Sequence, residues 1–264
     1  MKNIVLFQIK KQYKSVLVYL AALVGFAWMY ISLFPSMQKI DIEAMMSQLP
    51  KEFLGFLGEG GGSAYNTIEG FLSVEFFSFF FVLLIGFYVS SVAGAAIAGG
   101  IERRTMDFEL SQPVSRTKKL LSETFVAIIF SILIVTAANL MIKLLCVIYN
   151  IDISSKGLFY FSILASLFSM AIYGIAIFLS SIVRSKMSVV GITLFFTLGS
   201  YVFYSLSLAV EKIKDFGKFT LYYLYDPQKT LSRAELNLDH CLILLFIFIL
   251  GTITALIIFN KKDV

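Results

Sequence analysis

The chain has 264 residues, of which 58% are hydrophobic and 15% are charged, and its mean hydropathy is +0.85. Soluble globular proteins are typically about 45–50% apolar and about 25% charged, so this composition excludes a soluble enzyme domain and predicts a membrane protein. The formal net charge of +5 is spread through an apolar sequence instead of forming a basic patch, which excludes a disordered chain and a nucleic-acid-binding chain.

Several apolar stretches are long enough to cross a membrane, since a helix needs about 20 mostly apolar residues to span about 30 Å of hydrocarbon. They are too long and too uniformly apolar for the amphipathic helices of a soluble protein. The sequence therefore predicts an all-α integral membrane protein with a single transmembrane domain over residues 1–264. The six predicted spans are residues 17–34, 71–98, 120–149, 158–183, 187–210 and 241–259.

The basic residues predict the orientation of these spans. Most Lys and Arg residues lie in the N-terminal segment, in the loop 99–119, in the link 183–187 and in the C-terminal tail, which are all on one side. Because cytoplasmic loops are enriched in Lys and Arg, we expect both termini to be cytoplasmic. The first sixteen residues mix apolar and basic side chains, which predicts an interfacial elbow helix before the first span; a simple basic anchor is the alternative.

The motifs of covalent chemistry are missing from the sequence. A transport ATPase needs the phosphate-binding pattern G-x-x-x-x-G-K-[ST], but Gly217 and Lys218 are followed by Phe219, and the glycines at 58–62 have no Lys after them. His240 borders the last span and is interpreted as an interfacial residue. One His and two Cys are too few for a soft-metal centre. We expect no catalytic residue, no metal and no cofactor in this chain.

The predicted cytoplasmic loop 99–119 is the most charged stretch on its side and also carries apolar residues. It predicts a short amphipathic helix over residues 102–110, which Ser111 and Pro113 end because proline disfavours the α conformation in the residue before it. Ser115 is the predicted N-cap of the next helix. A helix followed by a sharp break is typical of a rigid element to which a partner protein docks on the cytoplasmic face. A solvated basic loop is the alternative. The apolar residues are Ile101, Met106, Phe108 and Leu110.

The segment 102–116, ERRTMDFELSQPVSR, resembles the E-x-x-x-G-T-x-E-x-L-L-S-x-P-V-S-R segment of bacterial ABC transporter permeases of the second exporter type, the ABC-2-type permeases. The Pro-Val-Ser-Arg element is its most specific part. Residues 49–53 and 67–71 resemble the first outer loop of that family, and residues 259–263 resemble its closing F-x-x-R-D. The chain departs from the pattern at Arg104, where the family usually has Gly before the Thr.

The resemblance implies a permease of the peptide or drug exporter branch, located as a multi-pass protein in a bacterial plasma membrane. It implies two cytoplasmic ATPase subunits, which bind ATP and Mg, and a second permease copy in a homodimer or a related heterodimer. It also implies a coupling helix in the loop 99–119 and a smaller contact in the link around Arg184. The implied ATPase-coupling residues are Glu102, Arg103, Arg104, Thr105, Phe108, Glu109, Leu110, Pro113, Ser115, Arg116 and Arg184.

Polar residues inside the spans indicate function or pairing, because charges in hydrocarbon are costly. At about 1.5 Å per residue, the third span reaches the outer interface near Lys143, and Glu75 reaches a similar depth on the second span. With Asn139, these two residues form a candidate polar patch at the outer mouth of the translocation path; the alternative is an ion pair that joins two spans. Glu123, one turn beyond Lys119, is expected to form an ordinary i,i+4 pair.

The outer loops differ in character. The loop 35–70 is acidic and predicts a short amphipathic helix around residues 41–57, whereas the loop 211–240 is aromatic and predicts an interfacial helix that Asp226 and Pro227 end.

The sequence as a whole favours the transmembrane subunit of an ATP-driven exporter. Its Phe-rich spans with few charges favour a hydrophobic or amphipathic substrate, a peptide before a lipophilic drug. A secondary transporter or channel, and a membrane scaffold or sensor subunit, are the alternatives.

Overall fold

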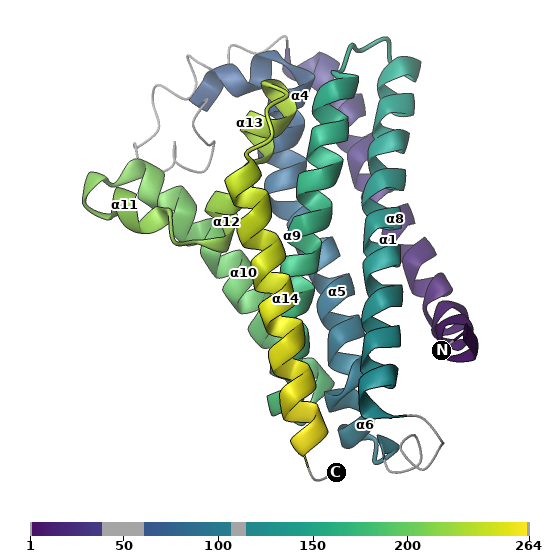
Figure 1. The fold of residues 1–264 in the computed structure, drawn as a ribbon. Helices are drawn as coiled ribbons and strands as arrows, with labels where there is room; N and C mark the ends of the chain where they lie inside the picture. Colours follow the sequence, from purple (N-terminus) through teal and green to yellow (C-terminus); the bar gives the residue numbers. More distant parts are fainter. Residues whose placement is uncertain (1, 39–60, 107–114, 263–264) are drawn as a thin grey trace.

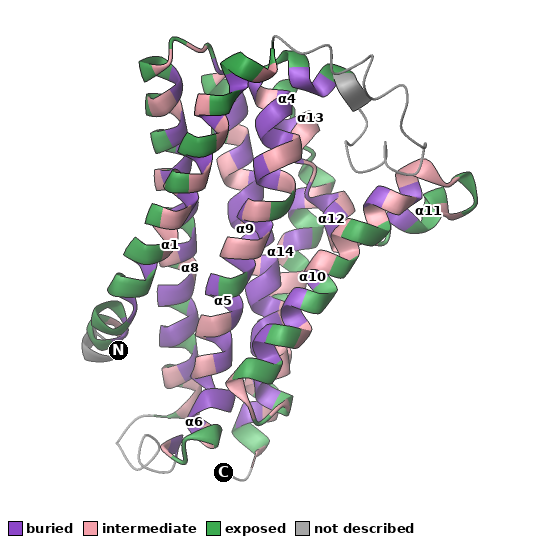
Figure 2. Ribbon diagram, turned by 180° about the vertical axis from the view of Figure 1, so that it is seen from behind, coloured by how far each residue is buried: buried purple, intermediate pink, exposed green. Residues whose placement is uncertain are grey.

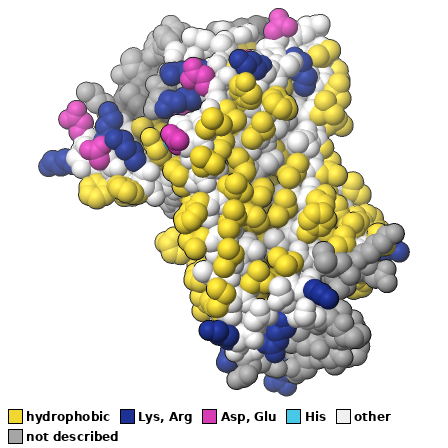
Figure 3. Space-filling view, viewed as in Figure 1, with side chains coloured by type: hydrophobic (Ala, Val, Ile, Leu, Met, Phe, Trp, Pro, Cys, Tyr) yellow, Lys and Arg dark blue, Asp and Glu magenta, His cyan; other side chains and the backbone are white. Residues whose placement is uncertain are grey.

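The computed structural model of the chain describes residues 2–38, 61–106 and 115–262, and every regular element in these ranges is helical. Six helical segments are long and apolar enough to cross a membrane. Figure 1 shows them side by side in one bundle, and Figure 3 shows hydrophobic side chains over the middle of one face, with Lys and Arg toward both of its ends and Asp and Glu toward the upper end. The predicted all-α fold with six transmembrane helices is confirmed.

The six spans follow one another along the chain with short helices between them. The second span is a continuous helical stretch that includes a π-helical segment, η3 (Ser73–Phe81), between α4 (Ile68–Leu72) and α5 (Val82–Ala96). The other spans are α1 (Lys2–Met37), α8 (Arg116–Ile148), α9 (Ser155–Ile182), α10 (Lys186–Ala209) and α14 (Leu238–Lys261).

Several helices continue beyond the predicted apolar stretches, because capping residues and not hydropathy end them. Ser115 is the N-cap of α8, as predicted, and its hydroxyl accepts a hydrogen bond from the backbone N–H of Lys118 at 3.3 Å. At the other end of α8, Asn150 has a φ of 54° and the N–H of Ile151 donates to the carbonyl of Cys146. This Schellman-type ending turns the chain sharply into α9.

The N-terminal segment is part of one continuous helix, α1, and not a separate element. Figures 1 and 2 show that its first turns bend away from the rest of α1. The interfacial position of an elbow helix stays a prediction. The predicted helix around residues 41–57 lies outside the described residues.

The predicted interfacial helix in the loop 211–240 is instead a 3₁₀ helix, η4 (Glu211–Ile213), followed by three short α-helices, α11 (Lys214–Gly217), α12 (Leu221–Leu224) and α13 (Pro227–Ser232). Asp226 and Pro227 start α13 and do not end a helix, which corrects the prediction. The carboxylate of Asp226 accepts from the backbone N–H of Lys229 at 3.0 Å, and proline fits the first helical turn, which needs no N–H. Tyr225 is fully buried and stacks on Phe168, so this loop is anchored in the bundle.

The centre of the bundle is formed by α9 and the second span (Figure 2). In the most apolar 18-residue stretch of each of these spans, 61% of the residues are buried, compared with 22% in α1 and in α14. Helices α9 and α14 approach each other closely. A Cβ on Gly174 would lie 2.7 Å from the Cα of Phe248, and a Cβ on Gly251 would collide with the backbone carbonyl of Gly174. These two glycines let α14 lie against α9, as small residues do in membrane helix packing.

Gly251→Ala is therefore expected to destabilise the fold by about 1–3 kcal/mol, because the added methyl group meets the backbone of α9. Thermal unfolding in detergent measures the effect as a lower Tm. Gly199→Ala is the matched control, since a Cβ there meets nothing within 4 Å and alanine favours a helix by up to about 1 kcal/mol. Equal Tm shifts in the two variants would contradict the close packing of α9 on α14.

Candidate functional site

Four chain segments meet at the end of the bundle that holds α6 (Ala98–Glu102) and the C-terminus, the lower end in Figure 1. We call this assembly the platform; it consists of residues 98–106, 115–119, 180–186 and 259–262. The backbone N–H of Ala98 donates to the hydroxyl of Ser180 at 3.0 Å, which fixes α6 against the end of α9. The platform therefore joins the two loops that the resemblance assigns to coupling.

Glu102 makes the bond between these two loops. Its carboxylate accepts from the backbone N–H of Lys186 at 2.9 Å and from the hydroxyl of Ser185 at 3.0 Å. Since Lys186 is the first residue of α10, a carboxylate here satisfies an otherwise free N–H and lies at the positive end of the helix dipole.

The bonds from Lys186 and then Ser185 hold the pKa of Glu102 below its ordinary value of 4.5. Its contribution to stability is therefore present above that value and is lost as the pH falls through the lowered value of the folded state.

The predicted helix over residues 102–110 is wrong at its start, because α6 ends at Glu102. Arg104 has a φ of 54°, its N–H donates to the carbonyl of Ile101, and the N–H of Thr105 donates to the carbonyl of Gly100, both at 3.0 Å. This pair of bonds is a Schellman ending with Arg104 in the left-handed position, where glycine costs least. Arg104 is also the residue at which the family pattern has Gly, the residue type that adopts this left-handed conformation at the lowest cost.

Arg116 holds the end of α14 on the start of α8. Its guanidinium donates to the carbonyl of Phe259 at 3.0 Å and to that of Lys262, and it lies 5.6 Å from the centre of the Phe259 ring. The ammonium of Lys262 in turn donates to the carbonyl of Ser181 at 2.8 Å. Arg116 therefore satisfies free carbonyls at the end of α14, a structural role that sequence analysis missed because its partners are far away in the chain.

The other predicted coupling residues divide into two groups. Arg103, Arg104 and Arg184 are exposed on the platform, and Thr105 is half-buried beside them. The remaining four, Phe108, Glu109, Leu110 and Pro113, lie outside the described residues.

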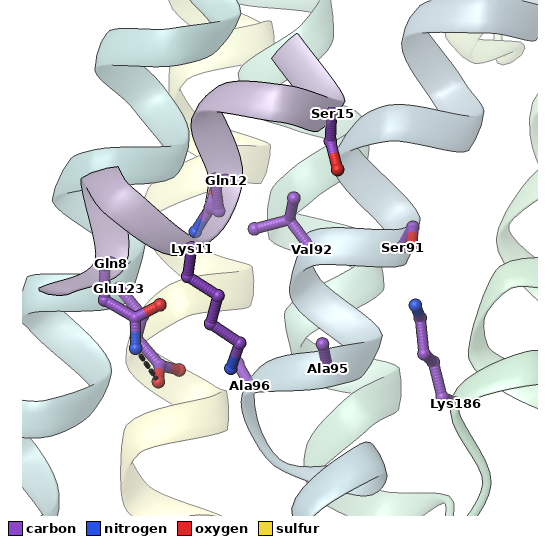
Figure 4. Close-up of a pocket in the computed structure, with 10 residues that line it drawn as sticks. All are labelled: Gln8, Lys11, Gln12, Ser15, Ser91, Val92, Ala95, Ala96, Glu123 and Lys186. Atoms are coloured by element: carbon purple, nitrogen blue, oxygen red, sulfur yellow. Dashed lines mark hydrogen bonds between the residues drawn. The ribbon is translucent and has the colours of Figure 1, made fainter. Parts of the chain in front are cut away.

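A polar cleft opens next to the platform, between α1, α5 and α10, with a volume of about 140 Å³. It is lined by Gln8, Lys11, Gln12 and Ser15 of α1, by Glu123 of α8 and by Lys186 of α10, against one face of α5 (Figure 4).

Glu123 is buried in this cleft, and its i,i+4 pair with Lys119 stays a prediction. Its carboxylate accepts from the side-chain amide of Gln8 at 2.8 Å, because α1 packs over this side of α8. The hydroxyl of Tyr88 donates to the amide oxygen of Gln12 at 3.3 Å. The sequence contained a signal for this cleft, since Gln8 and Gln12 lie one turn apart on one face of a helix, but not the identity of their partners.

The three residues of the predicted outer polar patch do not form one group. Glu75 accepts a hydrogen bond from the hydroxyl of Tyr65. Asn139 donates to the hydroxyl of Ser162 at 2.8 Å, and Lys143 donates to the carbonyl of Ile153 at 2.7 Å; both line a groove of about 620 Å³ between α8 and α9. Among the described residues no ion pair joins Glu75 to Lys143, so each polar side chain has its own local partner.

Arg104→Gly is expected to stabilise the turn after α6 by up to about 1 kcal/mol, because a left-handed residue with a side chain is strained by about 1–2 kcal/mol and glycine is not. Arg104→Val is expected to destabilise it, since a β-branched residue fits this region worst. Hydrogen exchange of the Thr105 amide measures both effects. At Arg103, whose φ is −84°, glycine should give no gain; a gain there equal to that at Arg104 would contradict the assignment.

Comparison with known proteins agrees with this architecture. A comparison with curated proteins finds no similar sequence. A family model described as ABC-2 family transporter protein matches residues 8–264, which is nearly the whole chain and includes the platform and the cleft. The chain therefore belongs to the ABC-2 family of transporter proteins and is a multi-pass membrane subunit of an ABC transporter.

Proposed function

We propose that this subunit is the permease of an ATP-driven exporter and that the platform is the surface on which a separate cytoplasmic ATPase docks. The observation that carries the proposal is the pair of hydrogen bonds that Glu102 accepts from Ser185 and Lys186, since it joins both predicted coupling segments into one body. The exposed arginines Arg103, Arg104 and Arg184 offer charge to a partner on this face.

The platform would transmit motion to several spans at once. Glu102 holds the start of α10, and Arg116 holds the end of α14 on the start of α8. When ATP closes a pair of ATPase subunits below two permease copies, a displacement of the platform moves the ends of these three spans together. ATP then drives the transporter between its states through its different affinity for them.

Both termini and the platform are cytoplasmic in this proposal, which agrees with the larger number of Lys and Arg residues in the segments on that side. The substrate is hydrophobic or amphipathic, with a peptide as the leading class and a lipophilic drug as the second, because the spans are rich in Phe and poor in charge. The second permease copy is identical or closely related, the membrane is a bacterial plasma membrane, and ATP and Mg bind to the ATPase partner.

Charge reversal of the exposed arginines, Arg104→Glu with Arg184→Glu, is expected to reduce recovery of the ATPase with the tagged chain by about tenfold, since two attractive charges become repulsive. The tagged chain is purified from its native membrane in mild detergent, and the co-purified ATPase is quantified. Arg233→Glu, an exposed change at the other end of the bundle, is the matched control. Arg116 is unsuitable for this test, because its reversal would also release α14.

Normal ATPase recovery with the double variant would exclude the platform as the docking surface. Absence of any ATPase from the wild-type preparation, even after cross-linking, would favour a scaffold or a secondary transporter.

A further inference from the structure

The cleft carries an excess of positive charge. Lys11 and Lys186 extend into it from α1 and α10, with Ala95 of α5 between them in Figure 4. Glu123 is the one acidic residue that lines it, and its Oε1 already accepts a hydrogen bond from Gln8 at 2.8 Å. Two ammonium groups against one engaged carboxylate favour an anionic occupant.

Neutral groups of the cleft complete a polar lining. The amide oxygen of Gln12 accepts from Tyr88, which leaves its N–H₂ group as the part available to other partners. The hydroxyls of Ser15 and Ser91 lie on the same lining. The volume of about 140 Å³ is roughly ten times the space that one water molecule needs, so it accommodates a compact head group and not a whole lipid or peptide.

Exposed apolar side chains lie next to the residues that line the cleft. Val18, three residues after Ser15 on α1, is 67% exposed, and Met187, next to Lys186, is 67% exposed. Such side chains at the end of a membrane span face hydrocarbon or another apolar partner. A ligand with a charged head and an apolar chain matches this arrangement, whereas a soluble anion would use only its polar half.

We propose that the cleft binds the compact anionic head group, a phosphate or a carboxylate, of an amphipath taken from the inner leaflet. This inference rests on the proposed function, because it names the substrate class of the exporter. Lys11 and Lys186 bind the anion from two sides, and the chain of the ligand lies along the exposed apolar surface of α1 and α10.

Lys186 also connects the cleft to the platform. Its side chain lines the cleft, while its backbone N–H donates to Glu102 at 2.9 Å. A head group that binds the Lys186 side chain therefore contacts the first residue of α10, and the backbone of this same residue is bound to Glu102 in the platform. Occupancy of the cleft is expected to shift the equilibrium between the states of the transporter. It would thereby change the rate of ATP hydrolysis by the partner, which is a coupling between two sites.

The test uses the intact permease–ATPase complex in nanodiscs of a neutral phospholipid, with ATP hydrolysis as the readout. Dodecyl phosphate is the probe, and dodecyl maltoside and inorganic phosphate are the comparison compounds. We expect only dodecyl phosphate to stimulate hydrolysis, and we expect Lys11→Gln and Lys186→Gln each to raise its half-maximal concentration about tenfold or more. Lys10→Gln, a neighbouring exposed lysine outside the cleft, is the matched control and should not change it.

Equal stimulation by inorganic phosphate would overturn the amphipath assignment, and an unchanged half-maximal concentration in both cleft variants would overturn the site. Direct binding of spin-labelled dodecyl phosphate to the purified chain, with the same variants, separates this inference from the proposed function. If dodecyl phosphate binds in a way that depends on the two lysines but the wild-type complex hydrolyses no ATP, the exporter proposal alone would be overturned. If dodecyl phosphate binds equally well to the Lys11→Gln and Lys186→Gln variants, the cleft assignment alone would be overturned.

Discussion

A helix that crosses hydrocarbon satisfies its own backbone polar groups everywhere except at its ends, and the architecture of this protein depends on how those ends are satisfied. At the platform the partners come from other helices. Glu102 accepts from the first N–H of α10, and Arg116 donates to the last carbonyls of α14. Because each bond joins the end of one span to another segment, the platform ties the ends of several spans together.

This arrangement links the motions of the loops that form the platform. Loops that are only covalently attached to their spans can move independently, whereas loops that cap one another's helices move as one body. The cleft lies directly beside this body, with Lys186 in both. In the proposed mechanism, a ligand in the cleft and an ATPase docked on the platform would both act on Lys186, which is a short route for coupling between two sites.

Local sequence was sufficient for the spans and for some of their caps, but not for the contacts between spans. The N-cap role of Ser115 was predictable, because it depends on the residues that follow it. The bonds of Gln8 to Glu123 and of Arg116 to Phe259 join residues more than a hundred positions apart, and no periodic pattern encodes such pairs. At Arg104, the sequence showed only a departure from the family's Gly, and the residue type did not indicate the left-handed backbone.

The rigidity of the platform is the central claim, and a distance measurement across it tests this claim most directly. Spin labels at the exposed positions Arg103 and Arg184 report the separation of the two loops by pulsed electron paramagnetic resonance. In the assembled transporter the separation is predicted to stay the same with and without ATP, and to broaden in Glu102→Ala, which removes the carboxylate that joins the loops. A separation that changes with ATP in the wild-type background would contradict the account, because the two loops would then move independently.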